Sequence, residues 1–148
     1  MTEKAAFNAE EWSKLVEAPA LAALRVIAAD RGGTIRESLS LGRAYSEARR
    51  DGSGLLQEIV STAPQVDPSE LKDRAALPQR TATALREALT LLEQKATPEE
   101  AQAYREFVLK VAETVARAHK EGGVLGIGGK EISESEQAVL DELAGLLR

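Results

Sequence analysis

The sequence predicts an all-α, single-domain helical bundle of six to seven helices that occupies residues 1–148. The apolar residues are mainly Ala and Leu, which lose little conformational entropy in a helix. Apolar residues recur at helical spacing through several long segments, and no segment alternates apolar and polar residues as a strand would. A chain of 148 residues is also long enough to bury a core as one domain.

The first predicted helix begins at a capping box, since Asn8 and Glu11 have the spacing at which each side chain bonds the other's backbone N–H. Pro19 is expected to break or kink this helix, because its ring clashes with the preceding turn. The segment 20–30, ALAALRVIAAD, is apolar on nearly all sides and predicts a central helix with neighbours all round. Arg25 is its only basic residue, and we expect it to reach the surface or to pair with a carboxylate.

The middle of the chain carries two further helix starts. Residues 34–37, TIRE, form a second capping-box pattern that opens a helix to about Arg50, and DGSG at 51–54 predicts a turn before the short amphipathic segment 55–60. Residues 67–70, DPSE, place a proline at the first helical position. A helical pattern then continues to about Lys95, with a break expected near Pro78.

Residues 97–100, TPEE, start the longest predicted helix. Its apolar residues recur at helical spacing and predict a core-facing stripe of Tyr104, Phe107, Val108, Val111, Val115 and Ala118. Ser133 and Glu136 cap the last helix, whose stripe is Val139, Leu140, Leu143, Leu146 and Leu147. The two ends of the chain share one pattern, in which an apolar helix ends at a Gly-Gly pair and a capped helix follows. Residues 8–62 and 97–148 are therefore also candidates for two half-repeats about a pseudo-twofold axis.

The composition of the chain excludes several classes of function. A net charge of −5 without a basic patch argues against nucleic-acid binding. The chain has no cysteine and one histidine, His119, so thiolate chemistry and sites with two imidazoles are absent. The N-terminus lacks a signal-peptide pattern, and no apolar run is long enough to span a bilayer. We therefore expect a cytoplasmic protein without a transmembrane segment, and peripheral membrane association remains open.

Five glycines fall between residues 122 and 129, in the run GGVLGIGG. Neither the Walker loop nor the dinucleotide fingerprint fits this spacing, because Val124 stands where the first Walker glycine belongs and Glu131 follows Lys130. Glycines cost backbone entropy unless the loop is held in place. Val124, Leu125 and Ile127 are therefore expected either to tuck into the core or to form an interaction surface for a protein partner or a second copy of the chain.

Acidic residues flank both inter-helix loops and allow a hypothesis of metal binding. Asp30 and Glu37 lie in the first region, and Glu121, Glu131 and Glu134 lie in the second. Oxygen ligands alone suit hard divalent cations such as Ca²⁺ or Mg²⁺. The alternative is structural, because carboxylates in a first helical turn stabilise the helix dipole and complete capping boxes.

The stretch GGKEISESE resembles the loop-to-helix signature of the TerB-like tellurite-resistance family, which has an Ala-Asp-Gly-x-Ile-Ser-x-x-Glu pattern. Ala29-Asp30 with Thr34 and Glu37 forms a partial copy. The resemblance covers about a third of the chain. It implies a duplicated helical bundle, acidic loops that bind divalent cations, and a role in bacterial stress responses. Gly128-Gly129 stands where the family has Asp, and Lys130 follows. From Tyr104 onward the chain also resembles uncharacterised bacterial proteins.

Two functions remain open at this point. The first is a non-enzymatic helical module, with no cofactor, that acts through protein–protein contacts, either with a different protein or as a homodimer. The alternative is a divalent-cation-binding domain that uses the acidic inter-helix loops. A third possibility is an enzyme that uses carboxylates, but the sequence shows no pair of residues spaced to act together in catalysis.

Overall fold

The computed structural model describes residues 2–29, 35–52, 54–62, 75–121 and 134–148, with the side chains of 35–40 and 118–121 left aside. Within these ranges every regular element is helical, which confirms the all-α prediction. The elements are a short 3-10 helix, η1 (Lys4–Ala6), and six α-helices: α1 (Ala9–Ala29), α2 (Ile35–Asp51), α3 (Gly54–Ser61), α5 (Leu77–Lys95), α6 (Pro98–Glu121) and α7 (Glu134–Leu146).

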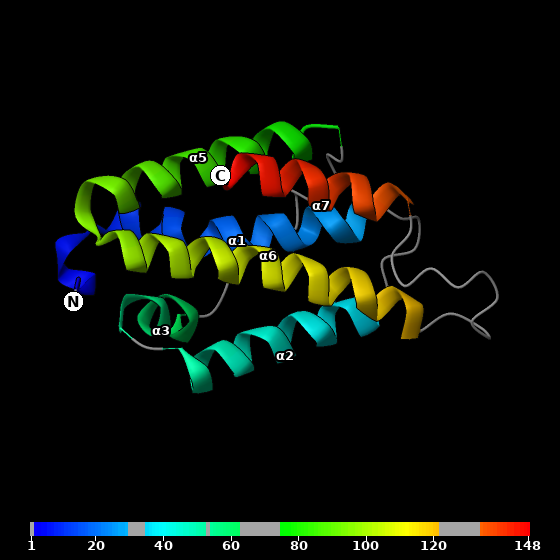
Figure 1. The fold of residues 1–148 in the computed structure, drawn as a ribbon, viewed down its shortest axis with the longest axis horizontal. Helices are drawn as coiled ribbons and strands as arrows, with labels where there is room; N and C mark the ends of the chain where they lie inside the picture. The colour runs from blue at the N-terminus through cyan, green and yellow to red at the C-terminus, as the bar shows by residue number, and fades with distance from the viewer. Residues whose placement is uncertain (1, 30–34, 53, 63–74, 122–133) are drawn as a thin grey trace.

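Helix α1 is the central helix of the bundle (Figure 1). It contacts α3, α5, α6 and α7, and residues 18–23 are buried without interruption. Six consecutive buried residues cover every direction around a helix, so this segment must be enclosed on all sides. The prediction of a surrounded apolar helix is therefore confirmed.

Of the two alternatives predicted at Pro19, a break or a kink, the break is wrong, because α1 continues through this residue to Ala29. A proline in a helix has no N–H for the carbonyl four residues earlier, which here belongs to Leu15. The buried Tyr104 hydroxyl of α6 donates a hydrogen bond to that carbonyl, with an oxygen–oxygen distance of 2.9 Å. A second helix thus satisfies the group that the proline leaves without its intrahelical donor, and α1 continues.

The capping box predicted at Asn8 and Glu11 is confirmed, and the helix start predicted at residues 97–100 has a capping box as well. The Glu11 backbone N–H donates to Asn8 Oδ1 at 2.8 Å, and the Asn8 N–H donates to the Glu11 carboxylate at 2.9 Å. Thr97 and Glu100 make the same reciprocal pair at the start of α6. Helix α5 begins at Leu77 with Pro78 in its first turn, as the expected break near Pro78 requires.

The predicted core stripes are buried. In α6 this applies to Tyr104, Phe107, Val108, Val111 and Val115, and at the C-terminal end to Val139, Leu140, Leu143 and Leu147, whereas Leu146 is half-buried. The side chain of Ala118 lies outside the described set. Trp12 is buried as well, and its indole N–H donates to Thr62 Oγ1 at 3.3 Å.

The helices on either side of α1 and α6 form two groups (Figure 1). Helices α5 and α7 lie on one side, where Arg25 of α1 pairs with Glu142 of α7, which is one of the two alternatives predicted for this residue. Helices α2 and α3 lie on the other side, and α2 packs mainly along α6. The proposed half-repeat stays a prediction.

The N-terminal segment is tied to the corner between α5 and α6. Thr2 donates from its backbone N–H and its hydroxyl to the Glu100 carboxylate, at 3.1 and 2.6 Å. The Lys95 ammonium donates to the Ala6 carbonyl and to the Glu11 carboxylate, and it lies 5.7 Å from the centre of the Phe7 ring. These contacts hold residues 2–8 against the bundle from several directions.

Candidate functional site

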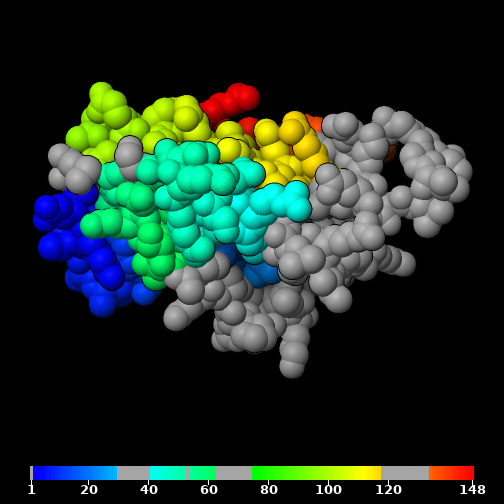
Figure 2. Space-filling model, turned by 90° about the horizontal axis from the view of Figure 1, so that it is seen from below, coloured from blue at the N-terminus to red at the C-terminus, as the bar shows by residue number. Residues whose placement is uncertain are grey.

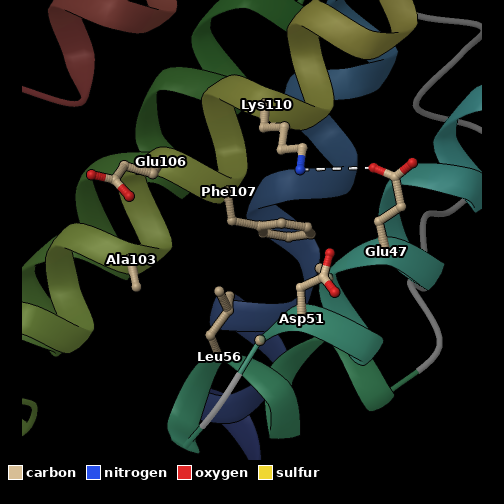
Figure 3. A pocket seen from close by; sticks show the side chains of 9 residues that line it. Glu47, Asp51, Leu56, Ala103, Glu106, Phe107 and Lys110 are labelled. Atoms are coloured by element: carbon tan, nitrogen blue, oxygen red, sulfur yellow. Dashed lines mark ion pairs between the residues drawn. The ribbon is translucent and has the colours of Figure 1, made fainter.

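A groove lies between α2, α3 and α6, and we call it the α2–α3–α6 groove (Figure 3). Its volume is about 300 Å³, which is at the lower end of the range for ligand pockets. It is lined by apolar residues and by charged ones: Ala48, Gly52, Leu56, Ala103 and Phe107, with Glu47, Asp51, Glu106 and Lys110. Figure 2 shows the face along which α2, in cyan to teal, runs beside α6 and next to α3.

A tight turn after α2 forms one end of the groove. The Gly52 N–H donates to the Ala48 carbonyl at 2.7 Å, and a Cβ atom at Gly52 would lie only 2.4 Å from the same carbonyl oxygen. Gly54 follows with a φ of 61°, in the left-handed region that favours glycine. Together these glycines turn the chain from α2 directly into α3, which places Leu56 opposite α6.

The floor of the groove is apolar and firmly packed. Leu56 comes from α3 and Phe107 from α6, and the Tyr45 ring of α2 meets Phe107 edge-on, with centroids 5.2 Å apart and planes at 86°. Tyr45 is buried, and its hydroxyl has no hydrogen-bond partner among the residues that the structure describes. Burial raises the pKa of this phenol far above its ordinary value, so Tyr45 adds no charge beneath the floor.

The rim of the groove is acidic. Three carboxylates, from Glu47, Asp51 and Glu106, and one ammonium, from Lys110, line the groove, so these lining residues carry a formal charge of −2. Lys110 Nζ lies 3.7 Å from the Glu47 carboxylate, in the ion pair that crosses from α6 to α2 in Figure 3. Glu106 stands at the α6 edge and accepts a hydrogen bond from Gln102 at 3.2 Å.

The ion pairs of the rim are long and exposed. Asp51 and its neighbour Arg50 are separated by 3.7 Å, and their side chains are 71% and 75% exposed. Pairs of this kind typically contribute less than about 1 kcal/mol, so they do not commit the carboxylates to their present partners. The rim is therefore a source of negative potential that a better-placed cation can use.

Most of the site residues predicted from sequence lie outside the described residues. This applies to Val124, Leu125, Ile127, Asp30 and Glu131, so neither the interaction loop nor the metal site is tested. Glu37 falls within α2, but its side chain is among those left aside. Glu134 is the first residue of α7, and its side chain is exposed. Glu136, predicted as part of the last capping box, is almost fully buried, at 1% exposure.

The described residues also bear on the predicted metal site and on membrane insertion. In the described part of the chain, no three acidic, histidine or cysteine side chains come together in a group that could hold a metal ion. Among the same residues, no helix combines the length and the apolar character that crossing a membrane requires. The cation site and the cytoplasmic location remain predictions.

The sequence reasoning did not single out the groove. Phe107 was assigned correctly to the core stripe of α6, and Leu56 was recognised as part of a short amphipathic segment, but nothing placed the two side by side. One signal was present. Glu47 and Asp51 are four residues apart, but Asp51 was assigned to the turn after a helix predicted to end at about Arg50, whereas in the structure it is the last residue of α2 and shares a helix face with Glu47.

Comparison with known proteins gives no relative. No family model, no curated protein and no solved structure matches this chain. The likeness to TerB-like proteins thus stays a prediction from two loop motifs, and function has to be argued from the geometry.

Proposed function

We propose that this protein is a non-enzymatic helical module that binds a segment of another protein in the α2–α3–α6 groove. The observation that carries the proposal is the combination, in one hollow, of an apolar floor and a charged rim. Grooves that bind protein segments generally use this combination, because the floor supplies affinity through burial and the rim selects the partner.

The construction of the groove also supports the proposal. Its walls belong to α2 and α6, which pack along each other, and the Tyr45–Phe107 ring contact joins them beneath the floor. A site that is already formed before binding loses little conformational entropy when a partner arrives. Leu56, which is half-buried on α3, can bury further apolar area against a partner side chain.

The broader parts of the hypothesis rest on sequence alone. A link to bacterial stress physiology comes from the TerB-like resemblance, and a contribution from Val124, Leu125 and Ile127 comes from the glycine-rich loop. Both remain predictions. The groove is a separate surface, formed by described residues of three helices, and it can be tested independently of the loop.

The test is selection of peptides from a random display library against the full chain, followed by measurement of their affinities by fluorescence anisotropy. Ala103→Trp places a large ring in the groove, and Ala138→Trp places the same ring at an exposed position on α7. We expect selected peptides to bind the Ala103→Trp variant at least about tenfold more weakly, a loss of about 1.4 kcal/mol or more, and to bind Ala138→Trp as they bind the parent chain. Failure to enrich any peptide, or equal affinity for the two variants, would contradict the proposal.

A further inference from the structure

The strongest unassigned feature of the groove is the position of its acids relative to the end of α2. Asp51 is the last residue of this helix, and Glu47 lies one turn before it. A helix C-terminus carries a partial negative charge from carbonyl groups without intrahelical donors, and this charge favours cations. Two carboxylates and the helix terminus therefore place negative potential at the same wall of the groove.

The basic residues nearest to this wall hold its two carboxylates only in long contacts. Lys110 stays at 3.7 Å from Glu47, and Arg50 at 3.7 Å from Asp51. Arg49 is directed elsewhere, since its Nε donates to the Val60 carbonyl at the end of α3, at 2.7 Å. The site is thus suited to a cation from outside the chain.

We infer that the α2–α3–α6 groove receives an arginine side chain of the bound segment. The aliphatic stem of the arginine lies on Leu56 and Phe107, and its guanidinium bonds Asp51 and Glu47. This inference rests on the proposed function and specifies which partner it selects. A volume of about 300 Å³ is too small for a whole helix but accommodates a long side chain with its flanking atoms.

Arginine fits this arrangement better than lysine does. A guanidinium is planar and weakly hydrated, and it presents five N–H donors that can bond two carboxylates at once. An ammonium is compact and strongly hydrated, and its three donors do not form the planar fork that matches a carboxylate. The acidic groove and an arginine-bearing segment are complementary in charge. An arginine in the groove therefore gains both the burial of its stem and charge-assisted hydrogen bonds.

The test is titration of the full ¹⁵N-labelled chain with three blocked peptides of repeating Ala-Leu-X-Ala sequence, in which X is arginine, lysine or citrulline. Citrulline has the shape of arginine but carries a neutral urea group. We expect the arginine peptide to shift the backbone amides of Asp51, Gly52, Leu56 and Phe107. The lysine peptide should bind several-fold more weakly, and the citrulline peptide about tenfold or more.

Variants separate a defined site from general attraction between a basic peptide and an acidic protein. Asp51→Asn should weaken binding of the arginine peptide several-fold. Asp141→Asn, at an exposed position on α7, removes the same charge and should leave binding unchanged. Equal losses from the two variants, or equal affinities of the arginine and citrulline peptides, would overturn the inference.

The proposed function and this inference fail in different ways. If library-selected peptides occupy the groove and are blocked by Ala103→Trp, but contain no arginine and show no dependence on Asp51, only the arginine inference is overturned. If no peptide of either kind shifts the groove amides, both are overturned.

Discussion

Replacing Tyr104 with phenylalanine removes a single hydroxyl from the centre of the bundle and is expected to destabilise the protein. The hydroxyl donates to the Leu15 carbonyl at 2.9 Å, and both residues are buried, at 1% and 0% exposure. Pro19 has no N–H with which to replace this donor. Leaving a buried carbonyl without a partner costs about 1–3 kcal/mol. For a chain of this size, each kcal/mol lowers Tm by about 2–4 °C.

The assay is urea unfolding followed by far-ultraviolet circular dichroism, with Pro19→Ala as the second arm of a double-mutant cycle. In the Pro19→Ala background the N–H of residue 19 can bond the Leu15 carbonyl, so Tyr104→Phe should cost less than half as much as in the parent chain. The coupling between the two positions should then be about 0.5–2 kcal/mol. In the double-mutant cycle, the free-energy cost of replacing the buried proline with a smaller side chain cancels, so it does not contribute to the coupling.

Two results would refute this reasoning. One is a loss of less than about 0.5 kcal/mol for Tyr104→Phe, because a buried carbonyl without a donor should cost more than that. The other is an equal loss in both backgrounds, which would show that the hydroxyl does not compensate for the proline.

Two further predictions concern the carboxylates at two helix starts and the glycines within and after α2. The pKa of Glu11 lies below its ordinary value because Lys95 and the Asn8 N–H bond its carboxylate. Burial by itself would raise the pKa of Glu100, but the hydrogen bonds from Thr2 and Thr97 lower it by more, so this pKa also lies below its ordinary value. These pKa values are lower in the folded than in the unfolded chain, so the stability that both acids add is present above about pH 4.5 and is lost as pH falls through the folded-state pKa values. The urea midpoint should therefore drop between about pH 6 and pH 3, and drop less in the Glu11→Gln, Glu100→Gln double variant. Gly42→Ala, at an exposed position of α2 where an added Cβ meets nothing within 4 Å, should stabilise the protein by about 0.5–1 kcal/mol. Gly52→Ala, with its 2.4 Å approach to the Ala48 carbonyl, should destabilise by about 1 kcal/mol or more, and calorimetry showing the same sign for both glycines would contradict this.

Local patterns predicted the helices well, because their signals lie within a few residues of one another. Asn8 with Glu11, and Thr97 with Glu100, satisfy helix-end groups three residues apart, so the sequence alone identifies them. The stripe from Tyr104 to Val115 likewise depends only on helical spacing. The expected break at Pro19 was wrong because the compensating hydroxyl comes from a residue 89 positions away in the sequence.

The groove could not be predicted for the same reason. Leu56 and Phe107 line one hollow only because α3 and α6 come together, and that arrangement depends on the packing of all the helices around α1. Glu47 and Asp51 share a helix face only because α2 continues to Asp51, one residue beyond its predicted end, and nothing in their spacing shows that this face borders an apolar floor. Long-range packing determines such a site, and a single sequence carries no direct record of it.

The most direct test of the account is a set of intermolecular nuclear Overhauser effects between a library-selected peptide and the methyl groups of the isotope-labelled protein. We predict contacts from the peptide to the Leu56 methyl groups and to the Ala103 methyl group, which line the groove from α3 and from α6. A selected peptide whose contacts fall on α5 or α7, with none to Leu56 or Ala103, would contradict the claim that this protein acts through the α2–α3–α6 groove.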